Sequence, residues 1–166
     1  MKSDYITRAK KFVPIVDEII YSGVKIDAMI EHFNRVKHRK IIFASGLTRY
    51  AFITSDYVIK VDYNPYEVHR FGGCEDEMEI YRLAKEDGME YLFAEITHYE
   101  YNGHDYYIMP RIHGIGRKWD DANEWMTEEE INWIDEHGIF DLHYNNYGWR
   151  DGHVCLIDYG AHVGAL

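Results

Sequence analysis

The chain has 166 residues, of which 46% are hydrophobic and 28% are charged, a size and balance typical of one globular domain. It has no apolar run of about 18 residues that could span a membrane, and its N-terminal segment lacks the cleavage site of a signal peptide, so we expect a cytoplasmic protein. The formal net charge of -11 disfavours nucleic acid as a partner and favours a basic one.

The first predicted elements in chain order are two helices. Apolar residues recur at helical spacing from residue 9 to residue 37, and Ser22 and Gly23 interrupt the pattern. From Lys40 onwards the pattern changes to three short strands, "KIIFAS", "YAFITS" and "YVIKVDY". Because short turns separate these strands, we expect an antiparallel meander.

A third helix, a hairpin and a fourth helix follow. The segment "CEDEMEIYRLAKEDG" begins with acidic residues and ends at Gly88, as a helix does. The strands "YLFAEITHYE" and "DYYIMPRI" enclose a tight turn at Asn102 and Gly103. Residues 127 to 137 form the last predicted helix, in which Thr127 and Glu130 make a capping box. The polar loop "DLHYNNYGW" and the strand "GHVCLIDYG" then follow.

This order of elements predicts an α+β fold. Three strands, a helix and two more strands indicate a five-stranded antiparallel sheet with one helix packed across it. Within a single domain (1–166) we distinguish a helical extension (1–39), a lobe with the sheet (40–112) and a short, mostly helical lobe (113–166). Cys74 and Cys155 lie far apart and outside any CxxC pair, so we interpret both as packed thiols.

Three charged residues stand next to apolar runs. Lys60 lies between Ile59 and Val61 and should point to the opposite face of its strand. There it is either a solvated lysine or the partner of an anion, and the next helix offers Glu75, Asp76, Glu77 and Glu79. Asp141 and Asp158 each follow a hydrophobic run, where an aspartate either caps a turn or presents a carboxylate in a pocket. Taken singly, these residues leave both interpretations open.

Taken together, their order resembles the motif set of protein-kinase-like proteins. Lys60 in "VIKV" corresponds to the strand lysine that holds nucleotide phosphates, and Glu77 corresponds best to its helix partner. Asp76 or Glu79 would take that place if the register shifted by a residue or two. The segment "MPRI", with Met109 and Ile112 at its ends, falls where the hinge behind the adenine would lie.

The C-terminal motifs complete the resemblance. The segment "DLHYNN" corresponds to the catalytic loop, with Asp141 and Asn146, and "DYG" to the metal-binding motif, with Asp158. His143 makes the loop similar to the "D-x-H-x-x-N" loop of aminoglycoside and choline kinase-like phosphotransferases. The host-modifying protein kinases of T7-like bacteriophages combine such a loop with a "V-I-K-V" strand, which would place the chain in a bacterial host cytoplasm. The resemblance extends over roughly residues 40 to 161 and implies a minimal protein-kinase-like fold.

The sequence departs from the family pattern at three places. The turn "ASGLTRYAF" has only Gly46 in place of three glycines, so the hydroxyls of Ser45 and Thr48 are the expected substitutes for missing phosphate donors. Ile139 and Phe140 replace the usual His-Arg pair before the catalytic aspartate. Six residues follow Gly160 in the sequence, so we expect no activation segment and no helical lobe to bind a peptide. An acceptor site would have to come from the N-terminal helices or a second subunit, or would be absent.

The resemblance implies ATP as phosphate donor and Mg²⁺ as cofactor. Lys60, held by Glu77, would orient the phosphates; Asn146 and Asp158 would bind Mg²⁺. Asp141 would accept the proton of the acceptor hydroxyl or orient it. Three functions stay open: a small atypical Ser/Thr protein kinase of phage type, a weak or inactive nucleotide-binding protein that acts by binding a partner, and a small-molecule kinase.

Overall fold

The computed structural model describes residues 2–114 and 121–161 and divides the chain into two compact units. Unit 1 comprises Met1–Asn64 and Thr97–Arg111, and unit 2 comprises Pro65–Ile96 and Ile112–Leu166. This division differs from the three predicted segments. The helical extension belongs to the same unit as the sheet, and the helix predicted from residue 74 belongs to the same unit as the C-terminal third.

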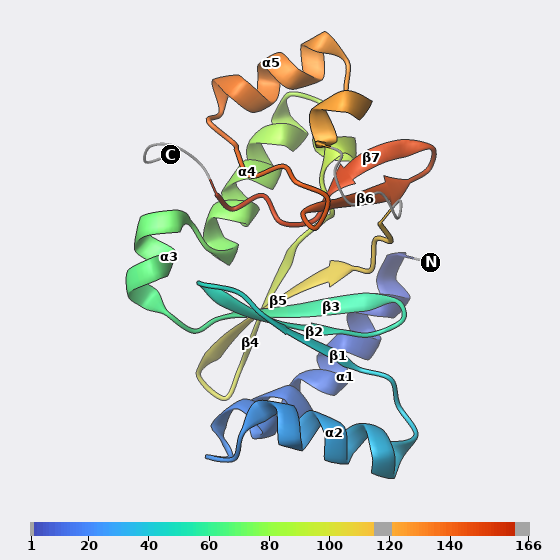
Figure 1. Ribbon diagram of the computed structural model, residues 1–166, viewed down its shortest axis with the longest axis vertical. Helices are drawn as coiled ribbons and strands as arrows, with labels where there is room; N and C mark the ends of the chain where they lie inside the picture. The colour runs from blue at the N-terminus through green and yellow to red at the C-terminus, as the bar shows by residue number, and fades with distance from the viewer. Residues whose placement is uncertain (1, 115–120, 162–166) are drawn as a thin grey trace. The chain divides into compact units, whose positions relative to one another are not determined.

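Unit 1 consists of two helices and one five-stranded sheet (Figure 1). The order of the strands across the sheet is β1-β2-β3-β5-β4, and every neighbouring pair is antiparallel. The predicted pair of helices and the predicted antiparallel sheet are therefore confirmed. The bounds are α1 (Lys2–Tyr21), α2 (Ile26–Lys37), β1 (Ile42–Ser45), β2 (Arg49–Ile53), β3 (Tyr57–Asp62), β4 (Thr97–Tyr101) and β5 (His104–Pro110).

The helix that packs on the sheet within unit 1 is α1. Its buried residues Ala9, Val13 and Val16 follow helical spacing and join one apolar cluster with Phe52 and Ile59 of the sheet. Burying an aliphatic or aromatic side chain of this size contributes about 1.5 to 3 kcal/mol. We predicted instead that the helix from residue 74 packs across the sheet. That packing is not confirmed. Local sequence patterns predict which face of a helix is apolar, but they do not predict which surface the helix packs against.

The β4–β5 hairpin confirms its predicted turn. Tyr101 pairs with His104, so Asn102 and Gly103 form a two-residue loop. Both loop residues have positive φ, 54° and 76°, as the right-handed twist of the flanking strands requires.

Unit 2 contains helices and one two-stranded sheet of β6 and β7. The helix from residue 74 and the capping box of Thr127 and Glu130 are confirmed. The expectation of a mostly helical C-terminal lobe is not confirmed, because this segment contains the β6–β7 hairpin beside η2 and α5. The bounds are α3 (Pro65–Phe71), α4 (Cys74–Glu86), η1 (Glu90–Leu92), η2 (Ala122–Trp125), α5 (Glu128–Glu136), β6 (Tyr147–Arg150) and β7 (His153–Leu156).

Both cysteines are buried and free, as expected of packed thiols. Burial raises the pKa of the Cys155 thiol to about 11, so the thiolate is disfavoured at neutral pH. Over residues 2–114 and 121–161, the longest apolar stretch of any helix falls short of what a membrane crossing needs.

Candidate active site

Lys60 is buried on the central strand of unit 1. It lies on β3 between Ile59 and Val61, which belong to the apolar cluster under α1, so alternation along the strand turns Lys60 to the other face. Its cross-strand neighbours are Ala51 and Tyr107, and only 5% of its surface is exposed. A lysine this buried is not the solvated surface lysine that was one of the two interpretations of the sequence.

Two hydrogen bonds of Gly46 hold the turn between β1 and β2. The amide of Gly46 donates to the carbonyl of Arg49 at 3.0 Å, and the carbonyl of Gly46 accepts from the hydroxyl of Tyr63 at 2.7 Å. Thr48 is buried and its hydroxyl accepts from Arg49 Nε at 3.2 Å, whereas Ser45 is exposed. Of the three residues predicted to grip phosphate, Ser45 is the one whose side chain faces solvent in this conformation.

The two residues of the predicted hinge belong to different units. Met109 is buried on β5, directly opposite Val58 of β3, in unit 1. Ile112 is also buried, but it is the first residue of the second stretch of unit 2. The chain therefore passes from one unit to the other within this segment.

The loop that carries Asp141 is a tight turn held from within. Asn146 Nδ2 donates to the carbonyl of Asp141 at 2.6 Å, and the amide of Asn146 donates to the carbonyl of His143 at 2.8 Å. His143 Nδ1 accepts from the amide of Asn145 at 3.2 Å, and its Nε2 lies 3.3 Å from Asp141 Oδ1. His143 thus organises the loop, the structural role that the sequence left open for it.

Asp141 is exposed and adopts a left-handed backbone conformation. Its φ is 66°, which aspartate tolerates better than most residues but which still carries a conformational cost. The neighbouring Leu142 is buried and fixes the turn to the interior. The carboxylate of Asp141 is therefore presented on the surface of unit 2 by a backbone that the Asn146 side chain holds in place.

The loop that carries Asp158 is joined to the first loop through one carbonyl group. The backbone oxygen of Asn146 accepts from the amides of Ile157 and Asp158, at 2.8 and 3.3 Å. The β6–β7 hairpin between them pairs Tyr147 with Leu156, so it sets this alignment from the other side. The structure accordingly brings Asp141, Asn146 and Asp158 together in unit 2.

Tyr159 and Glu77 anchor the second loop. The buried carboxylate of Glu77 accepts from the amide of Tyr159 at 3.2 Å, and the hydroxyl of Tyr159 donates to the carbonyl of Ala94 at 2.7 Å. The Tyr159 ring packs edge-on against Phe93, with a centroid distance of 4.8 Å. Burial raises the pKa of the Tyr159 hydroxyl, so it remains a hydrogen-bond donor.

A contact between two glycines brings the start of α4 close to the end of this loop. Gly72 has a φ of 86°, and a Cβ atom at this position would lie 1.7 Å from the carbonyl oxygen of Gly160. The backbone can approach so closely only because Gly72 has no side chain. Sequence reasoning missed both anchors of the loop. The Gly-Gly pair at 72 and 73 was a visible signal, but a main-chain bond to Glu77 leaves no pattern in the sequence.

The four acidic residues of α4 that could pair with Lys60 differ in their burial and in the contacts they make. Glu77 is fully buried, whereas Glu75 is exposed. Asp76 accepts from the amide of Gly73 at 2.7 Å in the capping box of α4, and Glu79 is paired with Arg82. Glu77 is therefore the most distinctive of the four. Its pairing with Lys60 stays a prediction.

Asn146 and Asp158 have the donor atoms that Mg²⁺ requires. Because Asn146 Nδ2 is bonded to the Asp141 carbonyl, the amide oxygen is the atom left for a cation, and Asp158 adds a carboxylate. Mg²⁺ is commonly held by one or two protein oxygens together with substrate phosphates, so this pair fits it. In residues 2–114 and 121–161 no group of three or more His, Cys, Asp or Glu could hold a metal by itself.

No protein-family model and no curated protein matches the chain. Among solved structures, it is similar to the Legionella pneumophila Lpg2603 kinase bound to IP6, with a TM-score of 0.49 and 18% identity over 78% of this chain and 52% of that one. It is also similar to WbdD, with a TM-score of 0.47 and 18% identity over 75% and 33% of the two chains. For the choline kinase LicA from Streptococcus pneumoniae, the TM-score is 0.38 and the identity 12%, over 82% and 69%.

These likenesses are weak. The chain spans 52% of the Lpg2603 structure and 33% of WbdD, and the TM-scores are 0.49 or lower. The function is therefore inferred from the residues of this chain.

Proposed function

We propose that the chain is an ATP- and Mg²⁺-dependent phosphotransferase. The observation that carries the proposal is the junction at Asn146. Its side chain holds the Asp141 loop, and its carbonyl holds the Asp158 loop. One residue thus aligns a general base with two oxygen donors suited to Mg²⁺, the arrangement that phosphoryl transfer needs.

Each residue has a role in this proposal. Lys60, with Glu77 as partner, orients the phosphates of ATP, and Met109 and Ile112 border the adenine. The oxygen of the acceptor hydroxyl forms a bond to the γ-phosphorus as the bond to the ADP oxygen breaks, and the hydroxyl proton passes to Asp141. Mg²⁺ held by Asn146 and Asp158 would offset the charge of the phosphate oxygens. Tyr159 and Glu77 keep Asp158 in position.

A Ser/Thr side chain of a protein is the acceptor that we propose first, in line with the resemblance to the phage kinases. A basic protein suits the net charge of -11. The second candidate, a nucleotide-binding protein with little or no turnover, is favoured by one observation. The Gly46 amide is already bonded to Arg49, so the β1–β2 turn has fewer donors left for phosphate. A small-molecule acceptor is the third candidate.

The test is transfer from ATP labelled on the γ-phosphate, with Mg²⁺, to the chain itself or to proteins of a bacterial lysate. We expect labelled protein, and we expect Asp158→Ala to lower the rate by at least about a hundredfold, since it removes a carboxylate that acts in the transition state. Binding of ATP without transfer would favour the second candidate.

The matched control is Asp135→Ala. Asp135 is an exposed aspartate of α5 in the same unit, so its substitution removes the same charge away from the loops. Its transfer rate should stay within about twofold of the parent chain, because exposed charges at a distance contribute little. Equal rates for Asp158→Ala and Asp135→Ala, with both variants folded, would refute the proposed site.

A further inference from the structure

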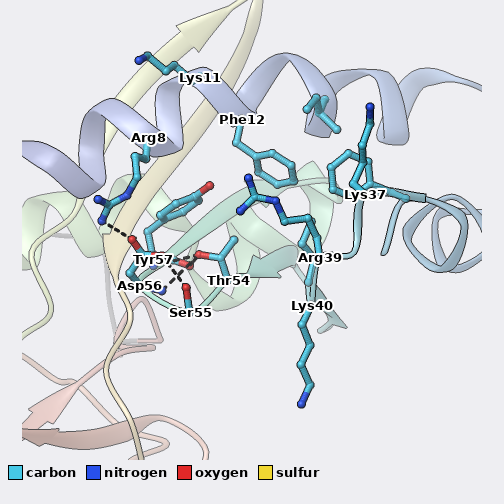
Figure 2. A pocket seen from close by; sticks show the side chains of 13 residues that line it. Arg8, Lys11, Phe12, Lys37, Arg39, Lys40, Thr54, Ser55, Asp56 and Tyr57 are labelled. Atoms are coloured by element: carbon cyan, nitrogen blue, oxygen red, sulfur yellow. Dashed lines mark hydrogen bonds and ion pairs between the residues drawn. The ribbon is translucent and has the colours of Figure 1, made fainter. Parts of the chain in front are cut away.

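Unit 1 contains a second candidate binding site, a pocket of about 570 Å³. It lies between α1, the end of α2, the segment that leads to β1 and the turn between β2 and β3 (Figure 2). We call it the basic pocket, because five cationic side chains line it: Arg8, Lys11, Lys37, Arg39 and Lys40. Small-molecule sites commonly measure about 300 to 1,000 Å³, so its size suits a small ligand.

The charge of the basic pocket is opposite to that of the chain. Within the described ranges 2–114 and 121–161, five lysines and arginines line this pocket, whereas Asp56 is the single aspartate or glutamate to do so. In a chain with a net charge of -11, randomly distributed charged residues would give an excess of acidic side chains, and this pocket has an excess of basic ones. Asp56 and Asp4, which both pair with Arg8, offset two of the five charges, and the remaining excess of three suits a doubly or multiply charged anion better than a single carboxylate.

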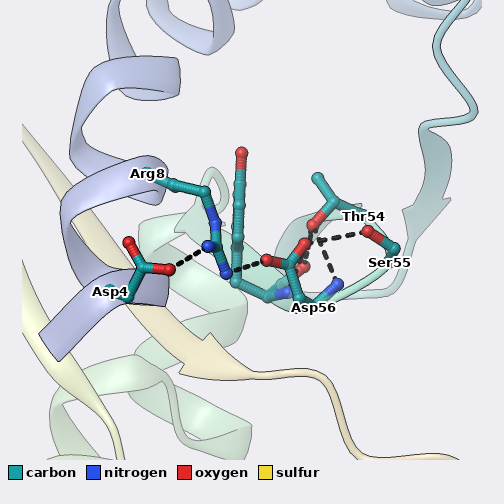
Figure 3. Close-up of polar contacts among 6 residues, drawn as sticks. Asp4, Arg8, Thr54, Ser55 and Asp56 are labelled. Carbon is teal, nitrogen blue, oxygen red and sulfur yellow. Dashed lines mark hydrogen bonds and ion pairs between the residues drawn. The ribbon is translucent and has the colours of Figure 1, made fainter. Parts of the chain in front are cut away.

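The two arginines differ in how they are held. Arg8 forms ion pairs with both Asp4 and Asp56 (Figure 3), so its guanidinium is fixed at one side of the pocket. Figure 2 shows the guanidinium of Arg39 on the other side of the Tyr57 ring, turned toward the pocket. Among residues 2–114 and 121–161, no side chain is hydrogen-bonded or ion-paired to the Arg39 guanidinium. Arg39 therefore has a planar set of donors to offer to a ligand.

The wall of the basic pocket is apolar and aromatic. The Phe12 ring lies 5.7 Å from the ring of Phe33 and 6.5 Å from that of Tyr57, measured between centroids, and Ile15 and Ile41 complete this surface. Such a wall favours a flat or bulky apolar group. A wholly hydrophilic anion would leave it uncovered.

We propose that the basic pocket binds a small organic phosphate, with the phosphate at Arg39 and the apolar body against Phe12, Phe33 and Tyr57. Guanidinium groups bind phosphate through two parallel hydrogen bonds, and the excess of positive charge favours its two negative charges over the single charge of a carboxylate. The basic pocket is distinct from the residues of unit 1 that we propose for the nucleotide. Ser45, Gly46, Thr48, Lys60 and Met109 are all absent from its lining.

The test is calorimetric titration of the full chain, at low ionic strength, with three probes: 2-naphthyl phosphate, 2-naphthol and inorganic phosphate. We expect 2-naphthyl phosphate to bind at least about tenfold more tightly than either fragment, because only this probe uses both the cations and the rings. Absence of heat with 2-naphthyl phosphate would overturn the proposal. If 2-naphthol bound as tightly as 2-naphthyl phosphate, the phosphate would not contribute to binding. If inorganic phosphate bound as tightly, the apolar wall would not contribute. Either result would overturn the proposal.

Three variants locate the binding. Arg39→Ala should weaken it by about ten- to a hundredfold, as expected for the loss of charge-assisted hydrogen bonds. Arg35→Ala is the matched control, since Arg35 is an exposed arginine of α2 outside the pocket, and its affinity should stay within about twofold. Lys60→Met should leave binding unchanged. An equal loss in Arg35→Ala would show general charge attraction, and loss in a folded Lys60→Met would place the probe in the nucleotide site; either result overturns the proposal.

Discussion

The two units hold their important residues by different means. In unit 1, Lys60 has its place because apolar neighbours on β3 are buried under α1, so ordinary side-chain packing positions it. In unit 2, Asp141 and Asp158 lie on loops that hydrogen bonds to the backbone hold, from the Asn146 side chain, the Asn146 carbonyl and Glu77, together with the contact of Gly72 with Gly160. A packed strand tolerates apolar substitutions that conserve volume, whereas loops held by specific hydrogen bonds and a close backbone contact tolerate little displacement.

The largest expected effect tests the glycine contact in unit 2. Gly72→Ala should lower the free energy of unfolding by about 3 kcal/mol or more, because the new Cβ would overlap the Gly160 carbonyl and force the loop to move. Gly88→Ala is the matched control, since Gly88 also has positive φ, 75°, but a Cβ atom added there would meet no other atom within 4 Å. It should cost about 1 to 2 kcal/mol for the backbone conformation alone. Equal losses in urea titrations would contradict the proposed backbone fit.

A smaller loss of stability is expected when a tyrosine hydroxyl that donates to a buried carboxylate is removed, and each unit has one such carboxylate. In unit 1 Asp17 accepts hydrogen bonds from Tyr106 and Asn102 and pairs with His104. In unit 2 Glu130 accepts from the hydroxyl of Tyr91 at 2.7 Å. Tyr106→Phe should cost about 1 to 2 kcal/mol of unfolding free energy, because Tyr106 is fully buried and Asp17 would lose a donor.

The matching change in unit 2 is Tyr91→Phe. Since 44% of the Tyr91 surface is exposed, water can replace its hydroxyl, and the expected loss is no more than about 0.5 kcal/mol. The measurement is chemical denaturation of both variants beside the parent chain. A larger loss of unfolding free energy in Tyr91→Phe than in Tyr106→Phe would show that burial does not determine how much these hydrogen bonds contribute to stability.

The smallest expected effect concerns pH. Burial acts to raise the pKa of Asp17, but hydrogen bonds from Tyr106, His104 and Asn102 outweigh it, and the pKa lies below its ordinary value of 3.8. Burial likewise acts to raise the pKa of Glu130, but the amide of Thr127 and the other donors lower it below 4.5. Because the folded chain binds fewer protons than the unfolded chain, the stabilisation is present above these ordinary values and is lost as the pH falls through the lowered ones.

The measurement is the melting temperature of the parent chain and of Tyr106→Phe as the pH falls from about 6 to about 3. The parent chain should lose more stability than Tyr106→Phe over this range, since the variant lacks one of the donors that lower the pKa of Asp17. Parallel curves would mean that the Tyr106 hydroxyl does not favour the ionised carboxylate.

Local sequence patterns were sufficient to predict most helices and strands, but not which elements pack against each other. Helical spacing in α1, alternation around Lys60 and the Asn102–Gly103 turn depend on neighbouring residues, and each is confirmed. The short helix α3 was missed, although Pro65 at its first position is a known start signal. The surface that α1 covers is a tertiary property, and no periodicity indicates it.

The same limit applies to the candidate site. Asp141, Asn146 and Asp158 were chosen from their order in the chain, and the structure places them together in unit 2. What the sequence could not indicate is the bond from the Tyr159 amide to Glu77, because every residue except proline has an amide to donate. The predicted role of Glu77 as the partner of Lys60 came from its charge and its place in the motif order, and neither indicates its contact with the loop backbone.

The β6–β7 hairpin has a consequence for how such a site can change. Asn146 directly precedes β6 and Ile157 directly follows β7, so the pairing of Tyr147 with Leu156 determines which amides the Asn146 carbonyl meets. A shift of one residue in a strand pair turns every side chain to the opposite face. Deleting a single residue from either strand would thus misalign the two loops while leaving Asp141, Asn146 and Asp158 all present in the sequence. A homologue could keep the full motif and still lose the site, so the length of this hairpin is as informative as the residues around it.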